Sequence, residues 1–95
     1  MFERVLKQPR SLIRKRQYII MIHALEEMGE DGVLVQDVEK AVLTGRIIER
    51  QVDRASGERK YVLAGMDCSG ESVDIILKIG PTRKAVAITV YREEE

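Results

Sequence analysis

A histidine and a glutamate four positions apart, His23 and Glu27, are the residues best suited to proton transfer. On a helix, this spacing places both side chains on one face, one turn apart. A carboxylate beside an imidazole orients the ring and raises its basicity, so the pair could act as a general acid or base. The alternative is a packed or capping histidine that bonds to the backbone. The sequence supports both interpretations.

Cations and phenols of the second half of the chain form another candidate site. Arg54, Arg59 and Lys60 are candidate phosphate contacts, because guanidinium donors match phosphate oxygens. Tyr61 and Tyr91 add donors for a developing charge. In the strand predicted at residues 46–54, the residues at alternate positions would line one face of the sheet: Arg46, Ile48, Arg50, Val52 and Arg54. The alternative is a solvated sheet face with no ligand.

The sequence contains no motif typical of other catalytic sites or of metal sites. The chain has no Gly-rich phosphate loop, no cysteine pair and no serine in a nucleophile-elbow pattern. Cys68 is the single cysteine and, like Asp67 and Ser69, is interpreted as a turn residue. With one histidine and one cysteine, the sequence predicts neither a metal site nor a cofactor.

The charges are balanced overall but segregated along the chain. The 95 residues carry 16 Lys+Arg and 16 Asp+Glu, which argues against a general polyanion binder. Residues 1–17 form a basic segment, whereas residues 26–39 contain six acidic residues and no basic residue. Such blocks are either solvated faces or patches that meet a partner, or each other, across an interface.

The first half of the chain has helical periodicity. Residues 1–17 are expected to be helical, but Pro9 makes one continuous helix doubtful. Residues 18–28 predict a second helix with stop signals at Gly29 and Gly32, although residues 17–22 fit a short buried strand equally well. Residues 35–44 predict a third helix, with Asp37 in its first turn and Gly45 after its end.

The second half changes to strand periodicity. Four strands are expected at residues 46–54, 59–66, 72–79 and 84–91, separated by turn residues at 56–57, 67–70 and 80–81. Short connections predict an antiparallel meander, and helices followed by strands indicate an α+β fold. We expect one domain over residues 1–95, with a basic helical segment at 1–17 and an acidic tail at 92–95. The longest apolar run, residues 18–22, is too short to span a membrane, so a cytoplasmic location is expected.

The stretch from His23 to Val33, HALEEMGEDGV, resembles the opening of the domain-of-unknown-function 4258 family of small bacterial domains, which typically reads HALERM and then ERGI. Further matching features lie downstream: Asp37-Val38, Gly45, Ile47-Ile48-Glu49, Gly57, Arg59-Lys60-Tyr61, Gly65 and Thr89-Val90-Tyr91. The resemblance covers about residues 18 to 91. It implies two or three N-terminal helices packed on a four-stranded antiparallel meander sheet, similar to RelE-like toxins of toxin–antitoxin systems, which act on RNA at the ribosome.

This chain departs from the family pattern at three positions. Glu27 and Asp31 stand where the family usually has arginines, and Asp74 stands where it commonly has a histidine. Acids in place of cations would repel a phosphate backbone, so the departures weigh against ribonuclease activity. Two functions remain open, and a third, smaller possibility is a binder of a small anionic ligand on the sheet face. One is a metal-independent ribonuclease of the toxin type, with an antitoxin-like protein partner, that uses His23, Tyr61 and Tyr91. The other is a non-catalytic protein-binding module or homodimer that uses the segregated charges.

Overall fold

The computed structural model describes residues 3–80 and 82–92 of the chain. Within these residues, one sheet has the strand order β1-β5-β4-β3-β2. The helices are α1 (Glu3–Arg14), α2 (Ile22–Asp31) and α3 (Val35–Thr44), and the strands are β1 (Tyr18–Ile20), β2 (Arg46–Val52), β3 (Arg59–Met66), β4 (Ser72–Ile79) and β5 (Ala85–Tyr91). The α+β class is therefore confirmed. Residues 1–2, Pro81 of the predicted last turn and residues 93–95 of the predicted acidic tail lie outside the described residues.

The sheet contains one more strand than the sequence predicts. Strands β2 to β5 form the expected antiparallel meander. The prediction of a purely antiparallel four-stranded sheet is wrong, because β1 pairs with β5 in parallel. The Met21 N–H donates to the Ala87 carbonyl at 3.0 Å, and the Ala85 N–H donates to the Gln17 carbonyl at 3.2 Å. The predicted helix at 18–28 is thus replaced by the strand alternative, followed by a later helix start at Ile22.

Helix α1 runs through Pro9, contrary to the expected interruption. A proline inside a helix loses one backbone hydrogen bond and costs about 3 kcal/mol. Pro9 is among the side chains with less than 2 % of their surface exposed, and Leu6 and Ile13 of the same helix are also buried. Burial of this apolar face against α3 and the sheet offsets the local cost, which local sequence patterns cannot show.

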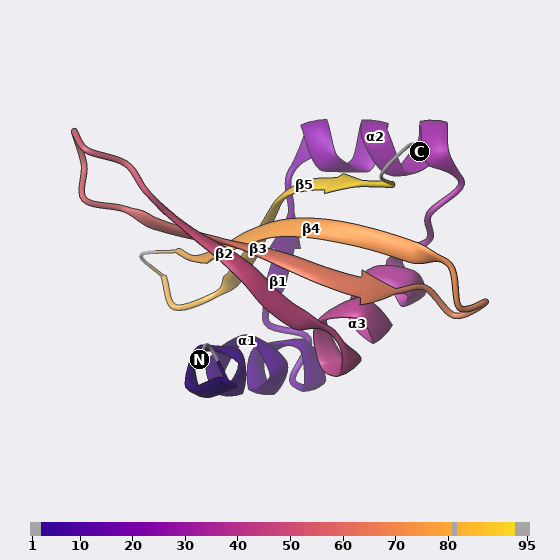
Figure 1. Ribbon diagram of the computed structural model, residues 1–95, viewed down its shortest axis with the longest axis horizontal. Coiled ribbons are helices and arrows are strands. Elements are labelled where there is room, and N and C mark those ends of the chain that lie inside the picture. Colours follow the sequence, from indigo (N-terminus) through magenta and orange to yellow (C-terminus); the bar gives the residue numbers. More distant parts are fainter. Residues whose placement is uncertain (1–2, 81, 93–95) are drawn as a thin grey trace.

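Helices α1 and α3 lie on one side of the sheet, whereas α2 lies along β5 (Figure 1). We call the side that faces α3 the helix face, and its central row consists of the paired residues Leu63, Ile75 and Val90, all fully buried. Gly65 lies on the same face, and a Cβ atom there would be 2.7 Å from the Ala41 Cβ. This glycine therefore allows α3 to approach β3 closely.

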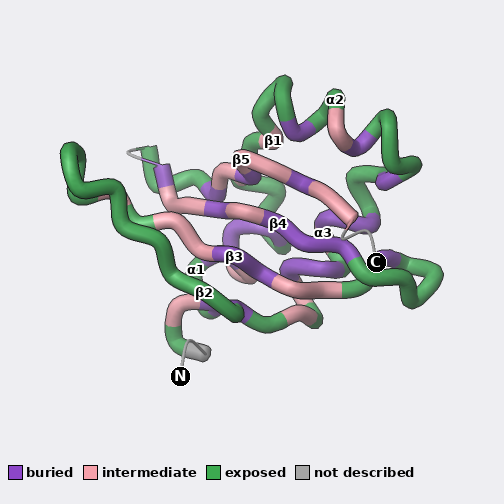
Figure 2. The backbone as a smooth tube through the Cα atoms, turned by 45° about the horizontal axis from the view of Figure 1, so that its top comes forward, coloured by how far each residue is buried: buried purple, intermediate pink, exposed green. Residues whose placement is uncertain are grey.

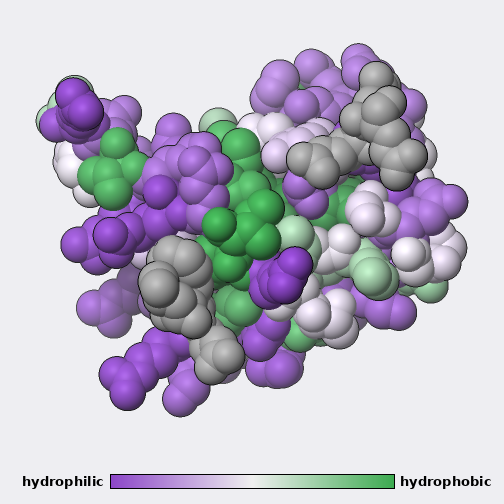
Figure 3. All heavy atoms as spheres, viewed as in Figure 1, coloured by the Kyte–Doolittle hydropathy of each residue, from purple (hydrophilic) through white to green (hydrophobic). Residues whose placement is uncertain are grey.

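The opposite side, which we call the open face, carries the alternate residues of the same strands. Its rows pair Val62 with Ile76 and Ala64 with Asp74. Burial is concentrated in the middle of β3, β4 and β5, whereas the β2–β3 hairpin is exposed along most of its length (Figure 2). Hydrophobic side chains gather in the middle of the side shown in Figure 3, between this hairpin and α2. None of the helices in the described part of the chain is long and apolar enough to cross a membrane.

A β-bulge at Ile48 corrects one prediction about β2. The pairing shifts between Ile47, opposite Leu63, and Glu49, opposite Val62. Because the extra residue reverses the alternation, Arg46 and Arg50 lie on opposite faces of the sheet. The strand then ends at Val52, which leaves Arg54 in the turn that follows. The predicted row of three arginines on one face does not form.

Candidate functional site

His23 lies on the exposed first turn of α2, with 70 % of its side-chain surface accessible. Its Nε2 atom is 3.5 Å from the Glu27 Oε1 atom, so the predicted i,i+4 pair is present. The same Glu27 oxygen accepts the Val90 N–H at 3.4 Å. Glu27 therefore faces the edge of β5, and the pair sits at the margin of the sheet on an exposed helix surface.

The second unusual acid, Asp31, repeats this arrangement one turn later. Its Oδ2 atom accepts a hydrogen bond from the backbone N–H of Arg92 at 3.4 Å. Beyond the short β1 strand, the edge of β5 would otherwise expose its N–H groups, and the two α2 carboxylates accept them. Glu27 and Asp31 thus bind the backbone at the edge of β5. The arginines that the family usually has at these positions gave no indication of this structural role.

Arg92 joins α2, the β3–β4 turn and the end of β5. Its Nη2 atom donates to the Asp67 Oδ2 at 2.8 Å, its Nη1 to the Ser72 carbonyl at 3.1 Å and its Nε to the Asp31 carbonyl at 3.2 Å. The sequence places Arg92 at the start of an acidic tail, and the pattern around it contains no sign of these contacts. Its partners come from two segments distant in the sequence, α2 and the β3–β4 turn with the first residue of β4.

Asp67 organises the β3–β4 turn and is only 2 % exposed. Its Oδ1 atom accepts hydrogen bonds from the Ser69 N–H, the Ser69 hydroxyl and the Glu71 N–H at 2.8 to 2.9 Å. The hydrogen bond from the Ser69 hydroxyl, followed by the one from Arg92, holds the pKa of the Asp67 carboxyl well below its ordinary value. A saturated, permanently charged carboxylate is unsuited to proton transfer, so Asp67 stabilises the turn, as the sequence predicts.

Asp37 connects the same turn to α3. Its Oδ1 atom accepts the Cys68 N–H at 2.9 Å, and its Oδ2 atom accepts the Leu34 N–H at 2.8 Å at the start of the helix. These backbone hydrogen bonds lower the pKa of Asp37. A hydrogen bond of the thiol itself to Asp37, followed by partial desolvation, raises the pKa of Cys68. A thiol that is harder to ionise is a poor nucleophile, which agrees with the interpretation of Cys68 as a turn residue.

The two candidate tyrosines lie on opposite faces of the sheet. Tyr61 pairs with Leu77 on the helix face and packs partly buried against the core. Tyr91 pairs with Asp74 on the open face at the other end of β4. His23 lies on α2 beyond the β5 edge, so the structure does not bring the three proposed catalytic residues to one place.

The candidate phosphate contacts do share one element, the β2–β3 hairpin. Arg59 pairs with Val52 and Lys60 with Gln51, and Arg54 follows in the turn. Successive residues of a strand point to opposite faces, so Arg59 and Lys60 diverge. Arg54 and Arg59 are exposed, and Lys60 is half-buried. The structure therefore places these cations on a protruding hairpin, away from α2, which carries His23, and from the end of β5, which carries Tyr91 (Figure 1).

A groove of about 600 Å³ lies between the end of α3, the end of β3 and the β3–β4 turn, as far as the start of β4. Lys40 and Arg46 flank it, and Thr44, Met66 and Ser72 contribute to its wall. None of the candidate catalytic or phosphate-binding residues lines it. Asp67, the acid in its wall, already accepts hydrogen bonds from Ser69, Glu71 and Arg92, so the groove holds no poised acid or base.

An exposed apolar surface is the feature that the sequence reasoning missed. Ile19 and Met21 are each 44 % exposed, Ile22 is 75 % exposed and Leu25 is 46 % exposed. We call these four residues the β1–α2 surface. They lie at the outer strand of the sheet and on the adjoining first turns of α2. The apolar run at 18–22 is predicted to be either the start of a helix or a short buried strand, yet Ile19, Met21 and its last residue, Ile22, are exposed. The uninterrupted length of that run was the available signal.

Comparison with known proteins agrees with the family resemblance. We found no significant match among curated proteins, and none among solved structures. The family described as "Domain of unknown function (DUF4258)" matches residues 21–92, which include α2, α3, and β2 to β5. Helix α1 and strand β1 precede the matched region. The match covers more than half of the chain, and the chain belongs to the DUF4258 family.

Proposed function

We propose that this chain is a relative of the RelE-like toxins of bacteria that acts in the cytoplasm as a non-catalytic protein-binding module. The observation that carries the proposal is the β1–α2 surface. Ile19, Met21, Ile22 and Leu25 lie within seven residues of the chain and are all exposed. Contiguous exposed apolar side chains next to charged residues are typical of protein interaction sites.

The arrangement of the candidate catalytic residues favours binding over ribonuclease activity. General acid–base cleavage of RNA requires an acid and a base within hydrogen-bond reach of the same phosphodiester. His23 is at the edge of β5, and Tyr61 and Tyr91 are on opposite faces. Glu27 places a carboxylate beside His23, and Asp31 lies further along the same helix, which disfavours a phosphate there.

Site-specific photo-crosslinking tests the binding function. A photoreactive amino acid replaces Ile22 in the β1–α2 surface, and in a control variant it replaces Val52, which is 52 % exposed on β2. In bacterial cells we expect protein adducts from position 22 and few from position 52, and Leu25→Asp should remove them. An adduct pattern that is equal at the two positions, or unaffected by Leu25→Asp, contradicts the proposal.

RNA binding through the β2–β3 hairpin is a second candidate function, because Arg54, Arg59 and Lys60 all lie on that hairpin. Binding of single-stranded RNA should then weaken steeply with salt, and the Arg59→Ala/Lys60→Ala variant should bind less at every salt concentration. The first proposal instead expects weak binding, RNA that stays intact in the presence of the purified chain, and normal growth during its expression. Cleavage that is lost in His23→Ala would overturn the non-catalytic assignment.

A further inference from the structure

We infer that the partner of the β1–α2 surface is a second copy of this chain, held by antiparallel pairing of the two β1 strands about a two-fold axis. The inference rests on the proposed protein-binding function and specifies its partner. Its basis is the combination of an open strand edge, exposed apolar side chains and a charge distribution that is complementary to itself.

The backbone of β1 is paired on one side only. Its residues pair with residues 85–87 of β5, and Gln17 and Met21 on either side of the strand bond to Ala85 and Ala87. Successive residues of a strand point their backbone groups to opposite sides, so Tyr18 and Ile20 direct theirs to the outer edge. No strand of the described residues pairs there, because β1 ends the sheet order.

A second β1 strand fits this edge in one favourable register. In this register Ile19 lies opposite Ile19 of the second copy. Tyr18 then lies opposite Ile20 of the second copy, and Ile20 lies opposite its Tyr18. Each such pair exchanges both backbone hydrogen bonds, and the Ile19 pair between them is of the non-hydrogen-bonded type, with a Cα separation of about 4.5 Å. The two sheets would then form one continuous sheet across the dimer.

The other edge of the sheet carries features that prevent such pairing. β2 contains the bulge at Ile48 and the charged residues Glu49 and Arg50. Bulges and charges are common protections of an edge strand against association. β1 has the sequence Tyr-Ile-Ile, with neither a charge nor a bulge. The contrast between the two edges points to β1 as the one adapted to pairing.

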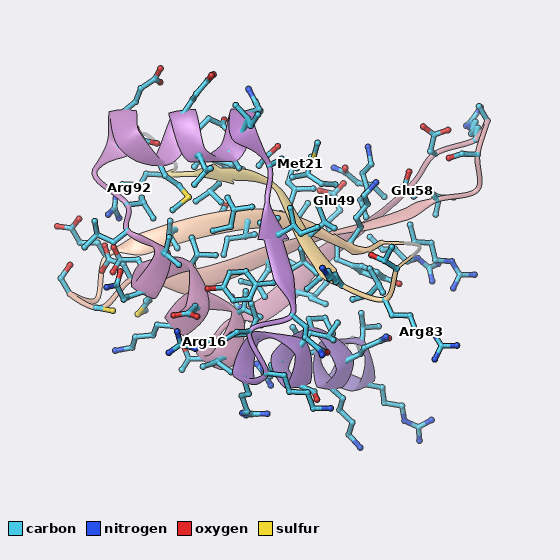
Figure 4. The ribbon with its side chains drawn as sticks, turned by 180° about the vertical axis from the view of Figure 1, so that it is seen from behind. Arg16, Met21, Glu49, Glu58, Arg83 and Arg92 are labelled. Carbon is cyan, nitrogen blue, oxygen red and sulfur yellow. The ribbon has the colours of Figure 1, made fainter. Side chains whose placement is uncertain are left out.

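The charges on either side of β1 select an antiparallel second copy. Arg14, Lys15 and Arg16 are exposed just before the strand, and Glu26 and Glu30 are exposed on the helix that follows it. Arg16 and Met21 mark the two ends of β1, with α1 beside one end and α2 beside the other (Figure 4). Antiparallel pairing reverses the second strand, so the basic end of each copy meets the acidic end of the other. Parallel pairing would place like charges together.

The side chains add apolar contact to the backbone pairing. Ile19 is on the open face, in register with Val86 of β5, and Met21 follows on the same face. Ile22 and Leu25 project from α2 towards solvent beside the strand end. A three-residue strand is too short to hold a dimer through its backbone alone. These four side chains are therefore required to bring the interface to the area of a stable dimer, above about 1,000 Å² in total.

Cysteine crosslinking tests the register directly. In a Cys68→Ser background, the Ile19→Cys variant should form an intermolecular disulfide under mild oxidation, because a pair at about 4.5 Å is within the Cα range of disulfides. Val52→Cys in the same background is the control, since it is similarly exposed on the opposite edge strand. The dimer inference fails when the two variants crosslink equally, or when light scattering shows a monomer at high concentration of the unmodified chain.

Charge reversal tests the two-fold arrangement without altering the core. The Arg14→Glu/Lys15→Glu variant and the Glu26→Lys/Glu30→Lys variant should each become monomeric, because like charges then meet in both halves of the interface. Mixed together, they should form a heterodimer in which both halves are complementary again. No heterodimer on mixing contradicts the antiparallel arrangement.

The outcomes separate this inference from the function on which it rests. If the chain alone is monomeric while photo-crosslinks at position 22 to another protein persist and require Leu25, the self-association is wrong and the binding function stands. If no adduct depends on Leu25, both are wrong.

Discussion

The Oδ2 atom of Asp67 lies 2.8 Å from the Nη2 atom of Arg92, and this ion pair joins the β3–β4 turn to the end of β5. Only 3 % of the Asp67 side chain and 23 % of the Arg92 side chain are exposed. The other donors and acceptors of the two residues reach α2 and β4. The pair therefore fixes the end of the molecule opposite the β2–β3 hairpin.

Stability should decrease in acid because of this pair. The folded-state pKa of Asp67 lies below its ordinary value of 3.8, so at a pH below about 4 the unfolded chain binds a proton that the folded chain does not. The contribution of Asp67 to the free energy of unfolding is therefore present above about pH 4, and it is lost as the pH falls towards the folded-state pKa. Urea midpoints measured from pH 6 to pH 2 should decrease, and Asp67→Asn should flatten the decrease. An unchanged slope in Asp67→Asn would contradict this role.

The close approach of α3 to β3 should make Gly65 intolerant of a side chain. A Cβ atom at this position would lie 2.7 Å from the Ala41 Cβ and 2.8 Å from the Ala41 carbonyl oxygen. We expect Gly65→Ala to lower the free energy of unfolding by about 1–3 kcal/mol through overpacking. Gly29→Ala is the matched control, because nothing lies within 4 Å of a Cβ there and the residue is helical. That variant should gain about 0.5–1 kcal/mol in urea unfolding.

Arg10 should stabilise the end of α3, although the sequence counts it as part of a basic segment. Its Nε atom donates to the Val42 carbonyl at 3.0 Å and its Nη2 atom to the Gly45 carbonyl at 2.7 Å. Arg10→Met keeps the aliphatic stem and removes both hydrogen bonds, so a loss of about 1.5–3 kcal/mol is expected in urea unfolding. Lys7→Met, at an exposed position of the same helix, should change stability by less than about 0.5 kcal/mol. Equal effects of the two variants would be inconsistent with a capping role for Arg10.

The carboxylate of Glu27 should protect the edge of β5. It accepts the Val90 N–H at 3.4 Å, and Glu27→Ala exposes that amide to water. Hydrogen exchange at Val90 should then become faster by about tenfold, corresponding to about 1.4 kcal/mol, while amides in the centre of β4 are unaffected. Glu26→Ala, at the exposed neighbouring position, serves as the control. Unchanged exchange at Val90 in Glu27→Ala would argue that α2 shields this edge by packing alone.

Local patterns in the sequence were sufficient to predict several elements. Helix α3 and strands β3 and β4 have the predicted bounds, because each combines a clear period with glycine-containing turns or a glycine stop. The meander of β2 to β5 follows from short connections, which allow only neighbouring antiparallel strands. Asp67 could be recognised as a turn residue for the same reason, since its hydrogen bonds to Ser69 and Glu71 are local.

Features that depend on distant segments were decided by the tertiary structure. Residues 18–20 become a strand because the edge of β5 offers backbone partners, and α1 continues through Pro9 because its buried face packs on α3 and the sheet. The bulge at Ile48 moves Arg46 and Arg50 to opposite faces, which separates a candidate site that strict alternation had assembled.

The candidate site shows the same division between local and distant determinants. The sequence by itself determined that His23 and Glu27 would be adjacent on a helix, since that requires only the helical repeat. Only the tertiary structure decided that Glu27 accepts a β5 N–H, that Arg92 joins Asp67, and that Tyr61 and Tyr91 are on opposite faces. These relationships join residues more than 20 positions apart, and their geometry is fixed by the packing of the sheet rather than by the periodicity of any one element.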